Sequence, residues 1–206
     1  MILAPFATAA SEYCEAGLAV IPCNGKVPAV LWQNMKRRPS QATVQKWADS
    51  KPKANVGALT ELSKLTVVDV DHPELLDPAI DEFGETPAVA KTGKGFHLYY
   101  LHAGERTLTN FHPGVDVRAA KGFIVLPPSV HPDTKKQYAW IEGGPETLSD
   151  LPQVRPGSLP LWGMPSTSMR SPGASTTSAT TPSMTKPAAL LSIAIPMRTL
   201  RPGYLA

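Results

Sequence analysis

The sequence predicts an α+β fold with a largely antiparallel or mixed sheet. Strand patterns outnumber helical ones, and the segments 115–119, 123–127 and 137–142 follow one another with no helical pattern between them. A doubly wound parallel sheet would instead alternate strands with helices. The chain has 206 residues, of which 42% are hydrophobic, so it is long and apolar enough for one packed domain.

The first third of the chain predicts two helices and a strand. Residues 4–16 have a helical pattern that ends at Gly17, because glycine favours the end of a helix. Residues 18–22 form a short apolar strand. Ser40 is a residue type that caps helices, and it precedes a helix that we expect over residues 41–49.

The middle of the chain predicts a strand, a helix and a second strand before the three strands named above. The strand over residues 65–70 is apolar, and the helix over 74–83 is closed by Gly84. The strand over 96–101 is rich in aromatic residues. Helices and strands are thus interspersed early and strands dominate late, which is typical of α+β folds.

The charge of the chain is distributed unevenly. The formal net charge is +3, but residues 1–164 contain 16 basic and 17 acidic groups, or about −1. Binding of phosphate groups by this part must therefore be local.

Of the 23 residues in 165–187, 16 are Ser, Thr or Pro, a composition typical of disorder. We expect a folded domain over residues 1–155 and a disordered tail over 156–206.

The sequence predicts a cytoplasmic protein. No run of 18 apolar residues occurs, so no membrane span is expected. The N-terminus has acids at Glu12 and Glu15 and does not start with the basic residues of a secretory signal.

Only two cysteines occur, Cys14 and Cys23. They are too few for a disulfide framework or a four-cysteine zinc site, so we expect no zinc and interpret both as small buried hydrophobes.

The strand over 65–70 runs into two acidic residues, Asp69 and Asp71. Alternate residues of a strand share a face, so these carboxylates lie roughly 7 Å apart and repel each other. A divalent cation such as Mg²⁺ or Mn²⁺ between them would remove that repulsion. The alternative is a strand end that leads into a solvated turn at His72.

A turn rich in glycine precedes the aromatic strand. Gly93 and Gly95 flank Lys94, and His97 follows. Exposed backbone N–H groups beside a lysine suit a phosphate, and the histidine can donate to a phosphate oxygen. No G-x-x-x-x-G-K-[ST] motif occurs in the chain, so this is not a Walker A loop. The alternative is an ordinary hairpin turn with a structural histidine.

The strand over 115–119 carries a third acid. Asp116 alternates with valines, and Arg118 lies on the same face of the strand. Asp116 is a candidate metal ligand, and Arg118 a candidate partner for a phosphate; a simple ion pair is the alternative. The turn PPSVH then presents Ser129 and His131, which either bind a nucleotide or cap the turn.

The order of these pieces is more specific than any one of them. It runs Trp32, Trp47, ANVG (54–57), LTVVDVD (65–71), TPAVAKTGKGFHLYY (86–100), GVDVRAAKGFIVLPPSVH (114–131) and YAW (138–140). This order resembles the bifunctional DNA primase/polymerase domain, the prim-pol branch of the archaeo-eukaryotic primase superfamily. The resemblance covers about residues 5–150.

The resemblance implies an RRM-like catalytic sheet joined to a smaller N-terminal α/β part. It implies that Asp69, Asp71 and Asp116 hold two divalent ions, Mg²⁺ or Mn²⁺, and that His97 contacts the incoming triphosphate. The segment with Arg118, Ser129 and His131 matches the part of the family that lies near the nucleotide, beside Lys94 of the glycine-rich turn. Short forms of this kind are typical of phages and plasmids.

The implied activity is that of a DNA primase or polymerase, which transfers nucleotides from NTPs or dNTPs onto a strand paired with a single-stranded DNA template. No helicase domain is recognisable in the chain, so unwinding would require a separately encoded helicase. Two alternatives stay open. One is a non-catalytic module that binds template or nucleotide and recruits a helicase, and the other is a metal-dependent nuclease or phosphatase.

Overall fold

The computed structural model describes residues 4–159. The tail expected over 156–206 lies outside the described residues from position 160 onward. Packing continues to the end of the described part, since Leu159 is buried. No helix within residues 4–159 is both long enough and apolar enough to cross a bilayer.

The first third of the chain forms the elements α1 (Pro5–Glu15), β1 (Val20–Asn24), β2 (Val27–Pro28), α2 (Gln41–Ser50) and β3 (Asn55–Leu59). Both predicted helices are confirmed. The predicted cap is confirmed as well, because the hydroxyl of Ser40 accepts a 3.2 Å hydrogen bond from the backbone N–H of Thr43. The strand β1 starts two residues later than expected, and the sequence did not predict β2 or β3.

The rest of the described chain forms β4 (Leu65–Val70), α3 (Leu76–Phe83), β5 (Val89–Lys91), β6 (Phe96–Leu101), β7 (Leu108–His112), β8 (Val115–Arg118), β9 (Phe123–Leu126) and β10 (Ala139–Glu142). Short 3₁₀ turns cover Glu61–Ser63, Pro73–Leu75 and Pro145–Ser149. The helix α3 starts two residues later than expected because the turn at Pro73 precedes it. The strands β5 and β7 were not predicted.

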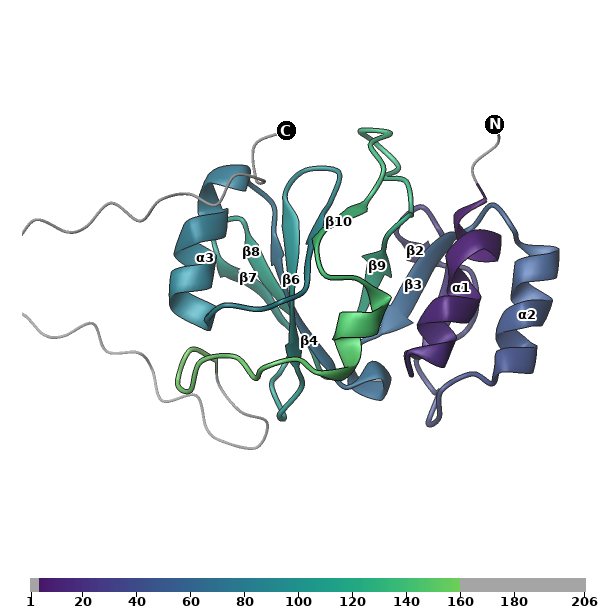
Figure 1. Cartoon of the computed structure of the whole chain (residues 1–206), viewed down its shortest axis with the longest axis horizontal. Helices are drawn as coiled ribbons and strands as arrows, with labels where there is room; N and C mark the ends of the chain where they lie inside the picture. Colours follow the sequence, from purple (N-terminus) through teal and green to yellow (C-terminus); the bar gives the residue numbers. More distant parts are fainter. Residues whose placement is uncertain (1–3, 160–206) are drawn as a thin grey trace, which may run out of the picture. The chain divides into compact units, whose positions relative to one another are not determined.

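The strands form two antiparallel sheets, which confirms the α+β class. The smaller sheet has the order β2-β1-β3-β9 and the larger one β10-β5-β6-β4-β8-β7. The smaller sheet is not purely N-terminal, because β9 from late in the chain lies beside β3 (Figure 1). In the same view α3 lies beside the larger sheet, and α1 and α2 lie together at the far side of the smaller one. The RRM-like description of the larger sheet stays a prediction.

One hydrophobic core joins the two sheets. It contains Phe6 of α1 and Val56 of β3 together with Val67 of β4 and Tyr99 of β6. Side chains alternate along a strand, so Asp69 of β4 lies on the same face as Val67, one step further along. The apolar face of β4 therefore ends in a carboxylate at the border of the core that both sheets share.

Candidate active site

Three of the predicted site residues form one row across three neighbouring strands. Asp69 of β4 is paired directly with His97 of β6 on one side and with Asp116 of β8 on the other. Directly paired residues of antiparallel strands have Cα atoms about 4.5–5.5 Å apart and point to the same face. The register of the larger sheet thus brings together residues that are 47 positions apart in the sequence, from 69 to 116.

Asp69 and His97 are in direct contact. The Oδ1 atom of Asp69 lies 3.3 Å from Nε2 of His97, and Nδ1 of the same ring lies 3.4 Å from the hydroxyl of Tyr99. Burial by itself would raise the pKa of Asp69, but the charge and hydrogen bond of His97, with Arg118 and Lys26, outweigh it and lower the pKa. Asp69 is therefore ionised at neutral pH.

Asp116 is bound within its own sheet. Its Oδ2 atom lies 2.5 Å from the guanidinium of Arg118, and its Oδ1 accepts a 2.6 Å hydrogen bond from the backbone N–H of Asn110. The prediction that Arg118 shares a face with Asp116 is confirmed. Whether Arg118 also reaches a phosphate stays a prediction.

Asp71 lies just beyond the end of β4 and is exposed. Its backbone N–H donates to the carbonyl of Gly114 over 2.8 Å, which extends the pairing of β4 with β8 by one step. Its charge also acts on Tyr138, which lies just before β10. Burial raises the pKa of Tyr138 most, and the charges of Asp69 and Asp71 raise it further, so Asp71, although exposed, belongs to the same cluster.

The three carboxylates fit a hard divalent cation in chemistry and in strand register. Carboxylate oxygens are the ligands that Mg²⁺ and Mn²⁺ prefer. Within residues 4–159, however, no three His, Cys, Asp or Glu side chains are drawn together at metal-binding distances. In this arrangement one oxygen of Asp69 contacts His97, and Asp116 is paired with Arg118.

The glycine-rich turn packs closely against the end of β4 and against the ring of His131. A Cβ atom at Gly95 would lie 1.9 Å from the carbonyl oxygen of Val70, and one at Gly93 would lie 2.3 Å from the ring of His131. Only glycine permits both approaches. The expectation of exposed backbone N–H groups is wrong at two positions, because Lys94 and Gly95 donate to the hydroxyl of Thr92.

Ser129 and His131 lie where β9 leads into the loop before β10. The hydroxyl of Ser129 is buried and accepts a 2.8 Å hydrogen bond from the backbone N–H of Val56, so it ties β9 to β3. A role of Ser129 at the nucleotide stays a prediction. The ring of His131 is 1% exposed, and its Nδ1 accepts from the backbone N–H groups of Asp133 and Thr134.

The second ring nitrogen of His131 is a buried donor without a partner. Because Nδ1 accepts two hydrogen bonds, the proton of the neutral ring is on Nε2. This Nε2 has no hydrogen-bond partner within residues 4–159. Burial lowers the pKa of His131, and the charges of Lys26 and Lys94 lower it further, while the acids Asp133 and Asp71 oppose them. His131 is thus a neutral donor between cations and acids.

Sequence reasoning missed two members of the site, Lys26 and Tyr138. Lys26 is exposed in the turn between β1 and β2, and its charge acts on both Asp69 and His131. Tyr138 is buried with its ring centroid 5.9 Å from that of His97 and 6.3 Å from that of His131. The pair Asn24-Gly25 between apolar runs is a hairpin signal that could have placed Lys26. No comparable signal points to Tyr138.

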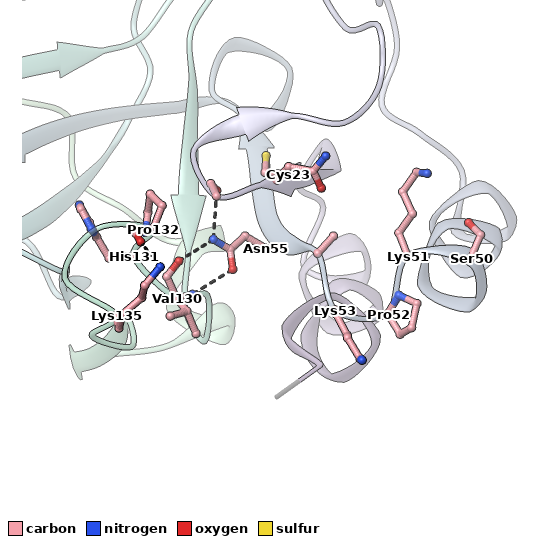
Figure 2. Close-up of a pocket in the computed structure, with 13 residues that line it drawn as sticks. Cys23, Ser50, Lys51, Pro52, Lys53, Asn55, Val130, His131, Pro132 and Lys135 are labelled. Atoms are coloured by element: carbon pink, nitrogen blue, oxygen red, sulfur yellow. Dashed lines mark hydrogen bonds between the residues drawn. The ribbon is translucent and has the colours of Figure 1, made fainter. Parts of the chain in front are cut away.

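Asn55 holds the turn of Lys26 beside the loop of His131. Its amide group donates to the carbonyls of Gly25 and Val130, over 3.0 and 2.7 Å, and its oxygen accepts from the backbone N–H of Val130. Figure 2 shows these hydrogen bonds radiating from one side chain. The smaller sheet therefore presents Lys26 and His131 toward the acids of the larger sheet as one fixed unit.

One comparison with known proteins identifies a family. The family model described as bifunctional DNA primase/polymerase, N-terminal, matches residues 10–162, which is more than half of the chain. The match spans every residue of the candidate site. A search among curated proteins finds no match.

Proposed function

The chain belongs to the bifunctional DNA primase/polymerase family, and on that premise we propose that it is a nucleotidyltransferase that synthesises or extends primers on a single-stranded DNA template. The observation that carries the proposal is the row of Asp69, His97 and Asp116 across three adjacent strands. The charge of Lys26, from the turn between β1 and β2, acts on the same row. Acids beside cations and neutral donors suit a reaction that handles a triphosphate.

The acids have one role in this proposal. Asp69, Asp71 and Asp116 would hold divalent Mg²⁺ or Mn²⁺ ions, which would make the attacking 3′-hydroxyl more acidic and stabilise charge on the transferred phosphate. Asp69 is prepared for this role because its pKa is lowered and it is ionised at neutral pH. His97 would then be released from Asp69 to bind the nucleotide.

The other side chains would orient the triphosphate. His131 offers an Nε2–H donor that is fixed by the two hydrogen bonds at Nδ1, so no proton has to move before it binds a phosphate oxygen. His97, released from Asp69, would donate in the same way. Lys94, Lys26 and Arg118 supply positive charge around these donors, and charge-assisted contacts to phosphate are the strong ones.

A primer-synthesis assay tests the proposal. The protein is incubated with Mg²⁺ or Mn²⁺, a single-stranded DNA template and NTPs or dNTPs, with and without a preformed primer. Products in both arms indicate a primase with polymerase activity, and products only with a primer indicate extension. Absence of products with either metal in both arms contradicts the proposal. Degradation of the template without synthesis would indicate a nuclease instead.

A second candidate is a non-catalytic module that binds template or nucleotide and recruits a separate helicase. One observation favours it, namely that His97 and Arg118 occupy the carboxylates of Asp69 and Asp116. It predicts binding of nucleotide and template without product. Removal of residues 165–206 tests the adaptor role, which requires that helicase association is lost while template binding is unchanged.

A further inference from the structure

A groove with a volume of about 700 Å³ lies next to the candidate active site. Its walls come from the end of β1 and the following turn (23–25), from the segment between α2 and β3 (50–55) and from the loop between β9 and β10 (130–135). Figure 2 shows Lys51 and Lys53 on one side, Lys135 and His131 on the other, and Asn55 between them. The groove thus belongs to the smaller sheet and its loops.

The lining of this groove is positively charged. Lys51, Lys53 and Lys135 contribute to it, and none of the lining residues is acidic. Residues 1–164 as a whole carry about −1, with 16 basic and 17 acidic groups, so the excess of positive charge is local. No ion pair to Lys51 or Lys53 is formed within the described part of the chain, and both side chains are exposed and available to an anion.

One end of the groove is lined by residues that adjoin the candidate active site, although the acids of the catalytic row do not line it. Gly25, which lines it, immediately precedes Lys26, whose charge acts on Asp69. His131 also lines it and carries the buried Nε2 donor that has no partner within residues 4–159. A ligand in the groove therefore lies beside His131 and beside the turn that carries Lys26.

The shape of the groove does not depend on a ligand. Asn55, in the wall formed by residues 50–55, is bound to both other walls. Its side chain forms hydrogen bonds with the carbonyl of Gly25 and with both backbone groups of Val130. The N–H of Lys51 is bound to the carbonyl of Trp47, which fixes the backbone where Lys51 leaves the helix α2. A groove that is held open in this way requires little ordering when it binds.

We propose that this groove binds the sugar–phosphate backbone of a single strand of nucleic acid and leads that strand to the catalytic row. The proposal rests on the function proposed above and assigns it a path for the strand. Lysines on both sides of a groove match a chain of phosphates better than one compact triphosphate. The lining has no Phe, Tyr or Trp on which bases could stack, so binding is electrostatic and tolerant of sequence.

The proposal is tested by direct binding, without catalysis. A labelled single-stranded oligodeoxynucleotide of mixed sequence, longer than the roughly 4–16 nucleotides that a small single-strand-binding fold covers, is titrated with the full chain by fluorescence anisotropy. The triple variant Lys51→Ala/Lys53→Ala/Lys135→Ala is compared with the control Lys36→Ala/Lys46→Ala/Lys64→Ala. The control removes the same charge from exposed lysines that do not line the groove.

The expected result follows from counterion release. Each phosphate contact to a single strand adds about 0.7 to the slope of log K against log salt concentration. Loss of three contacts reduces the slope by about 2 and weakens binding on the order of 100-fold near 0.1 M salt, with little effect near 1 M. The control keeps the slope of the wild type. The variant Lys51→Arg/Lys53→Arg/Lys135→Arg retains binding because it retains the charge.

Three results would overturn the proposal. The first is an equal salt slope and affinity for the wild type and the triple alanine variant. The second is no binding by the wild type at all. The third is a triple variant that loses affinity for a labelled dNTP but keeps its affinity for the oligonucleotide, since the groove would then hold a single nucleotide. Because no step of this test requires product, failure of the primer-synthesis assay is distinguishable from failure of the groove proposal.

Discussion

A carboxylate and a histidine are paired near each end of the strand β4, and the two pairs differ in their surroundings. At one end Glu105 lies 3.0 Å from His102 beside Thr66, and at the other Asp69 lies 3.3 Å from His97. The Glu105 side chain is 2% exposed, whereas the Asp69 side chain is 24% exposed. The same pair of residue types therefore occurs once in a closed setting and once in an open one.

The pair at Glu105 is saturated. Oε2 of this residue accepts from the hydroxyl of Thr66 at 2.7 Å and from the backbone N–H of Ala103 at 2.8 Å, in addition to its contact with His102. Burial alone would raise the pKa of Glu105, but these hydrogen bonds lower it to about 2. A carboxylate with all of its partners inside the fold has a structural role.

The pair at Asp69 is not saturated. His97 is the one hydrogen-bond donor found for Asp69 within residues 4–159, and Asp116 is its direct neighbour on the next strand. Although burial would raise the pKa of this carboxylate, the charges of His97, Arg118 and Lys26 keep the pKa below its ordinary value, so the group stays charged in a partly open place where an outside cation can join it. Both pairs contain a carboxylate and a histidine, so the residue types do not distinguish them. The number of hydrogen-bond partners of the carboxylate distinguishes the candidate site from the structural pair.

The largest effect is expected from Asp69→Asn. The amide still accepts a hydrogen bond from His97 but supplies no negative charge for a cation, so nucleotidyl transfer should fall by about 10³-fold. The free energy of unfolding should change by less than about 1 kcal/mol. Steady-state rates of primer extension and urea unfolding measure the two quantities. Asp77→Asn, an exposed acid of α3, is the control. Full activity of both Asp69→Asn and Asp116→Asn would refute the site.

The opposite behaviour is expected from Glu105→Gln. The amide keeps one acceptor oxygen but loses the charge that strengthens three contacts, so unfolding should become easier by about 2 kcal/mol, or roughly 30-fold. The transfer rate of the folded protein should stay close to that of the wild type. Glu146→Gln, at an exposed acid, serves as the control in the same denaturation experiment. A large loss of catalytic rate without loss of stability would reverse the assignment of the two ends.

The sequence predicted which of the candidate acids share a strand face, because side chains alternate strictly along a strand. The alternation of Asp69 with Asp71, and of Asp116 with Arg118, is a local pattern that survives in the fold. Their grouping was available only through the family resemblance, because the register that places Asp69 between His97 and Asp116 depends on pairing between distant strands. Register is determined by the packed face of a sheet, which a single segment does not reveal.

Lys26 and the lysines of the groove were missed for the same reason. The strand β3 gives a weak local signal and is stabilised by β9, which follows it by more than 60 residues in the chain. The edge strand β7 is exposed along most of its length and so has no alternating pattern. Lys26 and the groove lysines lie on turns and loops that only this long-range pairing brings together. The sequence therefore points to the acids and to Lys94 and Arg118, but not to the cations that the smaller sheet and its loops contribute.

A smaller effect is expected from Lys26→Ala. This substitution removes the positive charge that the turn between β1 and β2 places near Asp69. The variant loses a cation beside the triphosphate site, and a charged hydrogen bond contributes about 1.5–3 kcal/mol, so KM for the nucleotide should rise about tenfold or more with a smaller change in kcat. Lys26→Arg should restore most of the affinity, and Lys46→Ala should have no effect. An unchanged KM in Lys26→Ala would remove this residue from the site.

The smallest expected effect is the pH dependence of the stability that Glu105 contributes at one end of β4. The folded pKa of Glu105, about 2, is below its ordinary value of 4.5, so its stabilising contribution is complete above about pH 5 and is lost as the pH falls toward 2. This linkage predicts a loss of about 1 kcal/mol between pH 7 and pH 4. The difference in unfolding free energy between wild type and Glu105→Gln should therefore shrink by that amount, measured by urea titration at both pH values. A difference that stays constant would mean that the carboxylate at Glu105 is not held by its three donors, and the contrast between a saturated and an unsaturated pair would then lose its physical basis.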